Sequence, residues 1–340
     1  MRFFERNPRV DAAGGEKDLE DILNLMQVAE MKEKGDIVRL ASGFYPEARV
    51  SGKLLLAVDH SPNGRFALRL AGLIAATRGM PITVIPVGEE TVAPSTGKRK
   101  EPRSTEDEHP AKQAVADAAE EGKSKRSETE QKVEVTVRKP DLPGSDAVTE
   151  EARKGYDLLL IGLARTRSRS GRFRQDIERI GARFEGPVAI VEAKGDHKTL
   201  PEKSDLDVLV PINGTKMARH GAEVAMAIAR VVRAPLRVIY VSEAADRARA
   251  GRRSGTPMRW HEQAVLKDIV ELADSQDLEI KTAVRSATAA KNAILSEVGH
   301  NADRLIVMGV ARPVGETLFF GEIAAAVLAE SPASVLLVAS

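Results

Sequence analysis

Two kinds of loop in this sequence carry residues that could bind a phosphate group or another anion. The first kind follows a short apolar strand and contains Asp59 or Asn213. The second kind carries glycine and arginine and reads IGLARTRSRSGRFR at 161–174 and MGVARPVGETLFFGEI at 308–323. Glycine lets backbone N–H groups reach phosphate oxygens because no side chain intervenes, and a following helix adds partial positive charge. We therefore place the candidate binding residues in these loops.

Catalytic chemistry has little support in the sequence. The 6 histidines show no metal-ligand spacing such as H-x3-H, and there are no cysteines to supply a thiolate. Neither a G-x-S-x-G elbow nor a G-x4-G-K-[S/T] phosphate loop occurs. The sequence therefore predicts a protein without catalytic or metal sites, and weak ATP hydrolysis is kept as a minor alternative.

Composition sets the scale of the molecule. A chain of 340 residues with 42% hydrophobic and 30% charged side chains suits two soluble domains of ordinary size. The net charge of +1 gives no overall attraction to nucleic acid. No apolar run approaches the roughly 20 residues that a membrane helix needs, and the first residues lack a signal-peptide core. We expect a cytoplasmic protein.

A long internal repeat organises the chain. Residues Leu54–Val87 and Val208–Val241 align without a gap, and each contains an apolar strand, a polar turn, a helix, a proline and a second strand. A repeat of this length indicates two copies of one domain. We place the domains at 51–196 and 205–340, after a connector at 1–50 that contains one helix.

Alternating strands and helices predict the fold of each copy. The strands are short, rich in valine, isoleucine and leucine, and not alternating, as expected for a parallel sheet covered on both faces. The expected strands are 53–58, 81–87, 132–138, 157–162 and 187–192, then 207–212, 235–241, 278–285, 303–308 and 334–339. Helices are expected near 63–78, 110–121, 145–155 and 172–184, then 216–232, 260–275, 289–299 and 321–330. The fold class is α/β, with two doubly wound five-stranded parallel sheets. A mobile insertion is expected at 93–131.

Both halves resemble universal stress protein domains, whose fold is of the adenine nucleotide alpha hydrolase type. That family begins with a strand ending in V-D-x-S, and this chain has Val58-Asp59-His60-Ser61. In its nucleotide-binding members the fourth strand continues into G-x2-G-x9-G-[S/T], which wraps the phosphates. In the second domain Gly309 and Gly321 match the outer glycines, whereas Arg312 and Glu322 replace the middle glycine and the Ser/Thr. In the first domain only Gly162 matches, and Arg165 stands at the next position.

The resemblance implies an adenine or cyclic nucleotide, such as ATP, AMP or a cyclic dinucleotide, as the candidate ligand. Two interpretations of Arg312 stay open: it binds an anion, or it pairs with Glu322 and caps the helix. Asp59 would orient a ribose or base edge, or else form an Asx-type turn or helix N-cap, and Asn213 suits capping equally well. The tentative nucleotide or anion site consists of Asp59, Gly162, Arg165, Asn213, Gly309, Arg312, Gly315, Gly321 and Glu322.

A narrower resemblance covers most of the chain. The segments NGRFALRLAGLIAATRGMP, EARKGYDLLLIG, FEGPVAIV and GETLFFGEIAAAVL are similar to the cytoplasmic tail of bacterial monovalent cation:proton antiporters. In those proteins tandem stress domains follow the membrane antiporter in the same polypeptide. The resemblance implies a non-enzymatic regulatory module at the inner face of the plasma membrane. The alternative is a freestanding nucleotide-binding stress protein.

The last strand of each domain and two of the loops are expected to form contact surfaces. The last strands, Val188–Val191 and Val335–Val338, are expected to pair and form an internal pseudo-dimer, which removes two exposed sheet edges. Phe319 and Phe320 are expected to lie at an exposed site and to serve as a packing or docking contact, so that replacing both should impair dimerisation or docking. The arginine-rich loop of the first domain contains Arg167, Arg169 and Arg172. It is interpreted as a contact for an anionic membrane surface or an acidic partner, or else as a solvated loop.

Overall fold

The fold described here comes from a computed structural model. It describes residues 52–77, 79–87, 112–115, 117, 133–138, 144–167, 173–199, 205–243, 259–299, 304–312 and 320–340. The connector at 1–50, most of the insertion at 93–131 and the loop at 245–256 lie outside these residues. Within the predicted insertion, residues 112–115 are helical and Val115 is buried.

Each half of the chain contains five strands, as the sequence predicts. The strands of the first domain are β1 (Leu54–Val58), β2 (Ile82–Pro86), β3 (Val135–Val137), β4 (Leu158–Gly162) and β5 (Val188–Glu192). Those of the second domain are β6 (Asp207–Ile212), β7 (Leu236–Glu243), β8 (Ile280–Ala287), β9 (Arg304–Val310) and β10 (Ser334–Ala339). The neighbouring strands within each domain are parallel. The prediction of a doubly wound α/β fold is confirmed.

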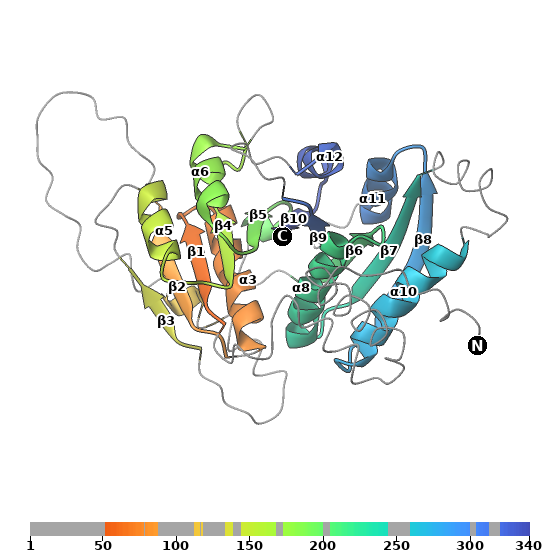
Figure 1. The fold of residues 1–340 in the computed structure, drawn as a ribbon, viewed down its shortest axis with the longest axis horizontal. Helices are drawn as coiled ribbons and strands as arrows, with labels where there is room; N and C mark the ends of the chain where they lie inside the picture. The colour runs from red at the N-terminus through yellow and green to blue at the C-terminus, as the bar shows by residue number, and fades with distance from the viewer. Residues whose placement is uncertain are drawn as a thin grey trace, which may run out of the picture. The chain divides into compact units, whose positions relative to one another are not determined.

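All ten strands belong to one sheet, in the order β3-β2-β1-β4-β5-β10-β9-β6-β7-β8 (Figure 1). The two domains join where β5 and β10 pair antiparallel, with Ile190 opposite Leu337. The predicted pseudo-dimer through the last strands is therefore confirmed. Both central strands are buried along their length because each is covered by its neighbours and by helices. The joint between the domains is part of the hydrophobic core.

Helices cover both faces of the sheet. One face carries α5 (Gly144–Ala152), α6 (Gln175–Arg183), α11 (Ala290–Val298) and α12 (Glu322–Glu330), whose apolar residues form one core cluster with both halves of the sheet. The other face carries α3 (Pro62–Ala76), α8 (Lys216–Val232) and α10 (Arg259–Asp274). Helices α3 and α8 contact each other across the domain joint. The core is thus continuous between the two copies.

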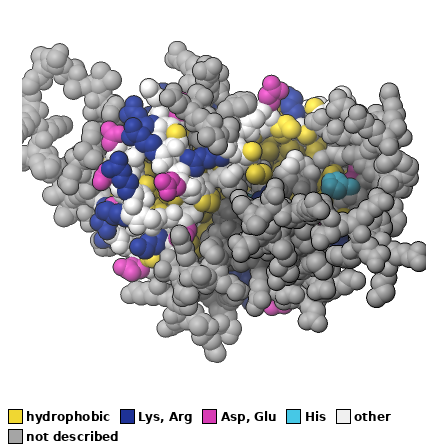
Figure 2. Space-filling view, in the orientation of Figure 1, with side chains coloured by type: hydrophobic (Ala, Val, Ile, Leu, Met, Phe, Trp, Pro, Cys, Tyr) yellow, Lys and Arg dark blue, Asp and Glu magenta, His cyan; other side chains and the backbone are white. Residues whose placement is uncertain are grey.

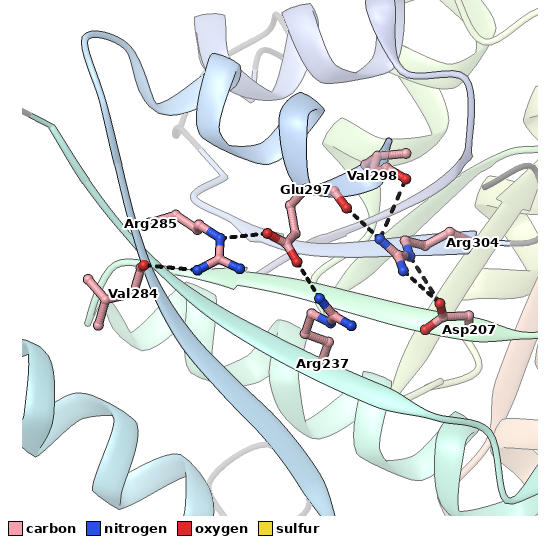
Figure 3. A network of polar contacts seen from close by, with 7 residues as sticks. All are labelled: Asp207, Arg237, Val284, Arg285, Glu297, Val298 and Arg304. Atoms are coloured by element: carbon pink, nitrogen blue, oxygen red, sulfur yellow. Dashed lines mark hydrogen bonds and ion pairs between the residues drawn. The ribbon is translucent and has the colours of Figure 1, made fainter. Parts of the chain in front are cut away.

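A buried glutamate anchors the same helix in each domain. In the second domain Glu297 on α11 accepts hydrogen bonds from Arg237 on β7 and Arg285 on β8, each at 2.6 Å (Figure 3). Burial alone would raise the pKa of Glu297, but the hydrogen bonds from Arg285 and Arg237 outweigh it and lower that pKa. In the first domain Glu151 on α5 accepts from Tyr156 and Lys154 and forms an ion pair with Arg138. These contacts fix the outer helices on the sheet.

A short helix that the sequence did not predict links the domains. Helix α7 (Asp196–Thr199) contains His197, which is fully buried. The His197 ring stacks on Phe66 with centroids 4.4 Å apart, and its nitrogens contact the Ser334 hydroxyl and the Asp205 carbonyl. Burial lowers the pKa of His197 more than the Asp205 contact raises it. The linker is therefore a packed part of the core with a neutral histidine.

Candidate functional site

The turn after β1 is built around the carboxylate of Asp59. One carboxylate oxygen accepts from the Ser61 backbone N–H at 3.0 Å and from the Ser61 hydroxyl. The other accepts from the Ala164 backbone N–H at 2.6 Å. Asp59 therefore forms the Asx-type turn that was one of its two expected roles, and it also holds the loop after β4.

The second domain repeats the turn without that link. The Asn213 side chain accepts from the backbone N–H and the hydroxyl of Thr215, at 3.2 and 2.8 Å. Within the described residues Asn213 makes no hydrogen bond to the loop after β9. The expected N-cap role of Asp59 and Asn213 is wrong, because Ser61 and Thr215 take that position and accept from the third residue of α3 and α8.

Gly162 and Gly309, the first glycines of the phosphate motif, both have a packing role. A Cβ on Gly162 would overlap the Asn63 carbonyl and the Ala67 side chain of α3. A Cβ on Gly309 would overlap the Met217 carbonyl and the backbone of Ala218. Each glycine is required where the strand end touches the first helix of its domain. Their presence is therefore explained without a bound phosphate.

Asn63 is a site residue that the sequence analysis missed. Its amide donates to the Leu163 carbonyl at 2.8 Å and accepts from the Ala193 backbone N–H at 2.8 Å, and the side chain is buried. It therefore holds the carboxyl ends of β4 and β5 together. The repeat contained a signal for this role, since the aligned residue in the second domain is Met217, which cannot make these bonds.

Arg312 reaches across to the other domain. Its guanidinium donates to the Gly186 carbonyl at 3.0 Å and to the Gly181 carbonyl in the last turn of α6. A cation at the carboxyl end of a helix is stabilised by the helix dipole and by the unpaired carbonyls there. Burial lowers the pKa of Arg312, which remains charged because an arginine in a protein is not deprotonated. In the described residues Arg312 forms no pair with Glu322, so that interpretation is wrong.

The amino end of α12 keeps one feature of a phosphate loop. Gly321 has φ +88° and ψ 162°, a conformation that is almost exclusive to glycine, and no described atom lies within 4 Å of its Cβ position. Glu322 is exposed in the first turn of α12, where a carboxylate is favourable for the helix dipole. Gly315 lies outside the described residues.

Phe320 is not an exposed docking residue. It is 8% exposed, and its ring lies 5.1 Å from that of Phe173, with the planes at 60°. Each of the two phenylalanines stands two residues before the last helix of its domain, so they occupy equivalent positions. The expected exposed site is wrong for Phe320, whereas the packing contact, one of its two expected roles, is confirmed because its ring packs on Phe173 of the other domain. Phe319 lies outside the described residues.

Arg167 also acts within the molecule. Its guanidinium donates to the Ala325 carbonyl of α12 at 3.3 Å, so the loop after β4 contacts the second domain. This contact explains Arg167 without an external partner, while Arg165 is exposed. Arg169 and Arg172 lie outside the described residues.

Lys194 strengthens the same joint from the end of β5. Its ammonium donates to the carbonyls of Leu328 and Ser331 at the carboxyl end of α12, at 2.6 and 2.8 Å. Burial lowers the pKa of Lys194, and the nearby Glu192 opposes that shift only in part. The last helix of each domain is thus bound at its carboxyl end by a cation from the other domain.

Other surfaces show mixed charge. Lys and Arg side chains gather over β1, α5 and α6 in the view of Figure 2, with acidic groups among them. Four exposed basic residues of this domain form ion pairs with acids: Arg138, Arg153, Lys154 and Arg183. Among the described residues no group of His, Asp and Glu could hold a metal ion. In the same part of the chain no helix has the length and hydropathy to cross a membrane.

The fold and these loops define a class: tandem doubly wound α/β domains fused through their last strands, with altered phosphate loops at the carboxyl edge. The sequence profile of the universal stress protein family matches residues 51–192 and 207–339. The chain belongs to the universal stress protein family. No curated protein matches it.

Solved structures of similar fold include a universal stress protein from Archaeoglobus fulgidus DSM 4304. It is 20% identical, with a TM-score of 0.51, and the match covers 84% of this chain and 97% of that one. The cytoplasmic domain of a prokaryotic cation chloride cotransporter is 11% identical, with a TM-score of 0.46 and coverage of 85% and 95%. A universal stress protein in complex with cAMP is 19% identical, with a TM-score of 0.31 and coverage of 39% and 96%. At 20% identity the likeness to the Archaeoglobus fulgidus protein concerns the fold alone.

Proposed function

We propose that this chain is a non-enzymatic regulatory module, the cytosolic tail of a cation:proton antiporter, which binds an adenine or cyclic nucleotide in its second domain. The single observation that supports regulation most strongly is the position of Arg312. It stands where nucleotide-binding relatives would have the middle glycine of the phosphate loop, and it holds two carbonyls of the first domain. A ligand at this loop would therefore change the contact between the domains.

Gly321 supports the nucleotide as ligand. Its backbone conformation leaves the amino end of α12 without a Cβ, so an anion could approach the first N–H groups of that helix. The first domain is a poorer candidate for an anion site. Arg174, which has a side chain, stands before α6 where the second domain has Gly321, and the loop after β4 is already bound by Asp59. The second domain is thus the better candidate for a responsive site.

A calorimetric titration of the full chain with ATP, AMP and cyclic nucleotides tests the ligand. Gly321→Ala should lower the affinity about tenfold or more, because a Cβ and a changed φ displace the helix end. Gly155→Ala is the matched control, since Gly155 also has a positive φ and open space around its Cβ position but lies outside the loop. Equal affinities for the native chain and Gly321→Ala would refute this binding site.

The transporter role needs a separate experiment. We would determine whether the reading frame that encodes this chain also encodes antiporter helices, and then measure proton-coupled cation transport in inverted vesicles. Nucleotide should change the transport rate of the native protein and not of Gly321→Ala. A chain that binds nucleotide but is encoded without membrane helices would support the freestanding sensor instead.

A further inference from the structure

The second domain has a groove at the amino edge of the sheet, opposite to the loops that follow β4 and β9. It lies where β7 and β8 begin, beside the ends of α8 and α10, and its volume is about 730 Å³. Figure 1 shows this edge at the starts of the β7 and β8 arrows. Volumes of roughly 300–1,000 Å³ are usual for small-molecule sites. The groove is therefore large enough for a metabolite.

Two residues of the groove have an unfavourable backbone conformation. Arg233 and Asp277 have φ of 53° and 54°, and they are the described non-glycine residues with positive φ. Both line the groove. Left-handed backbone costs Arg233, the C-cap residue of α8, about 1 kcal/mol or more relative to glycine, whereas aspartate adopts it more readily. Such strain concentrates at binding sites, where the side chain has a use that glycine lacks.

The first domain shows which residues stand at the corresponding positions of the other copy of the repeat. Arg233 aligns with Gly79, which has φ +65° in the first domain, and Arg230 aligns with Ala76. Lys281 on β8 pairs in register with Arg237 on β7, and Thr136 on β3 pairs with Thr83 on β2. Because Arg237 and Thr83 align in the repeat, Lys281 corresponds to Thr136. All three cations of the groove thus stand where the first domain has a small or neutral residue. The charge is specific to the second domain.

The composition of the groove indicates the ligand. Arg230 and Arg233 offer planar guanidinium groups and Lys281 an ammonium, which suit a phosphate group. Asp277 and Glu279 line the same groove and accept hydrogen bonds from hydroxyl or amino groups. We propose that this groove binds a small soluble phosphate monoester that also carries hydroxyl or amino groups. This site is independent of the nucleotide site proposed at the carboxyl edge.

The test is a calorimetric titration of the full chain with glucosamine 6-phosphate, with glycerol 3-phosphate as a second probe. Arg233→Gly restores the residue of the first domain and removes the backbone strain, so the protein should fold at least as well as the native chain. We expect its affinity for either probe to fall about tenfold or more, consistent with the loss of a charge-assisted bond. Lys281→Thr should act in the same direction.

The controls separate this site from others. Lys267→Ala removes an exposed charge of α10 that does not line the groove, and it should leave the affinity unchanged. Gly321→Ala should also leave it unchanged, so failure of the nucleotide site and failure of this one are distinguishable. The proposal is overturned if neither probe binds at millimolar concentration, or if Arg233→Gly and Lys281→Thr bind as the native chain does. Binding only to vesicles that contain phosphatidic acid would overturn the assignment to a soluble ligand.

Discussion

The two loops at the carboxyl edge differ in what holds them. The loop after β4 is bound within its own domain, by Asp59 to Ala164 and by Asn63 to Leu163. The loop after β9 has Asn213 and Met217 at the aligned positions, and its described anchor is Arg312, bound to the first domain. The loop of the first domain is therefore held within its own domain as well as by Arg167 at Ala325, whereas the described contact of the second domain's loop is to its neighbour. On the proposed function, a ligand bound to the second domain would therefore alter the joint.

The same contrast holds at the opposite edge of the sheet. The first domain ends α3 with an ordinary glycine turn at Gly79, while the second ends α8 with the strained Arg233. At one position the second domain has a cation, Arg233, where the first has Gly79; at the other, Arg312 is bound to the first domain whereas the aligned Arg165 is exposed. A duplicated fold can thus keep one copy as scaffold and change the other for recognition.

Arg304→Ala should have the largest effect on stability. The Arg304 side chain is 7% exposed and binds Asp207 and the last carbonyls of α11, so its removal leaves buried acceptors unpaired (Figure 3). Asp207 is itself 30% exposed, so we expect the free energy of unfolding to fall by about 3 kcal/mol through the loss of several charge-assisted hydrogen bonds rather than of a fully buried pair. Urea denaturation followed by circular dichroism would measure it. Arg153→Ala, which removes an exposed ion pair, should cost less than about 0.5 kcal/mol.

Arg312→Ala should have the next largest effect. The variant loses two charge-assisted bonds, one to Gly181 of α6 and one to Gly186 after it, and we expect the free energy of unfolding to fall by about 2 kcal/mol. Arg165 is the matched control, because it is the exposed arginine of the corresponding loop in the first domain. If Arg312→Ala and Arg165→Ala unfold at the same urea concentration, Arg312 does not hold the domains together.

Exchanging the residue types at Asp59 and Asn213 tests whether the loops after β4 and β9 are held differently. In Asp59→Asn an amide would replace the carboxylate that binds both Ser61 and Ala164, and one N–H would lose its acceptor. We expect this variant to lose about 1 kcal/mol. The reverse change, Asn213→Asp, keeps the turn acceptor and should be nearly neutral. Equal losses in both variants would show that the loops are held alike.

Mild acid should weaken the linker by a smaller amount. Burial, with a minor contribution from Arg69, lowers the pKa of His197 below its usual 6.5, so the unfolded chain binds a proton more readily than the folded one. Stability should therefore be full above about pH 6.5 and fall as the pH drops toward the pKa of the folded state. Denaturation of the native chain and of His197→Gln at pH 7.5 and 5.5 would measure this. A slope with pH that is unchanged in the variant would exclude His197 as its cause.

The fold could be predicted from the sequence because its main signals are local. The apolar strands and the repeat determine the elements, and the pairing of β5 with β10 followed from two apolar strands that each needed a partner. The contacts of Arg312 and Phe320 could not be predicted in this way. Their partners, Gly181 and Phe173, belong to the other domain, and no spacing in the chain reveals a contact across the joint. The sequence singled out Arg312 as a candidate for binding an anion or capping the helix, but it did not reveal the contact with Gly181 and Gly186.

Hydrogen exchange measured by mass spectrometry, with and without AMP, tests most directly whether the second domain's loop couples ligand to the joint. We expect AMP to slow exchange at the amino end of α12 and to speed it at 181–186, where Arg312 would release its two carbonyls. In Arg312→Ala the segment 181–186 should exchange rapidly with or without AMP. Slower exchange at α12 with no change at 181–186 in the native chain would contradict the coupling.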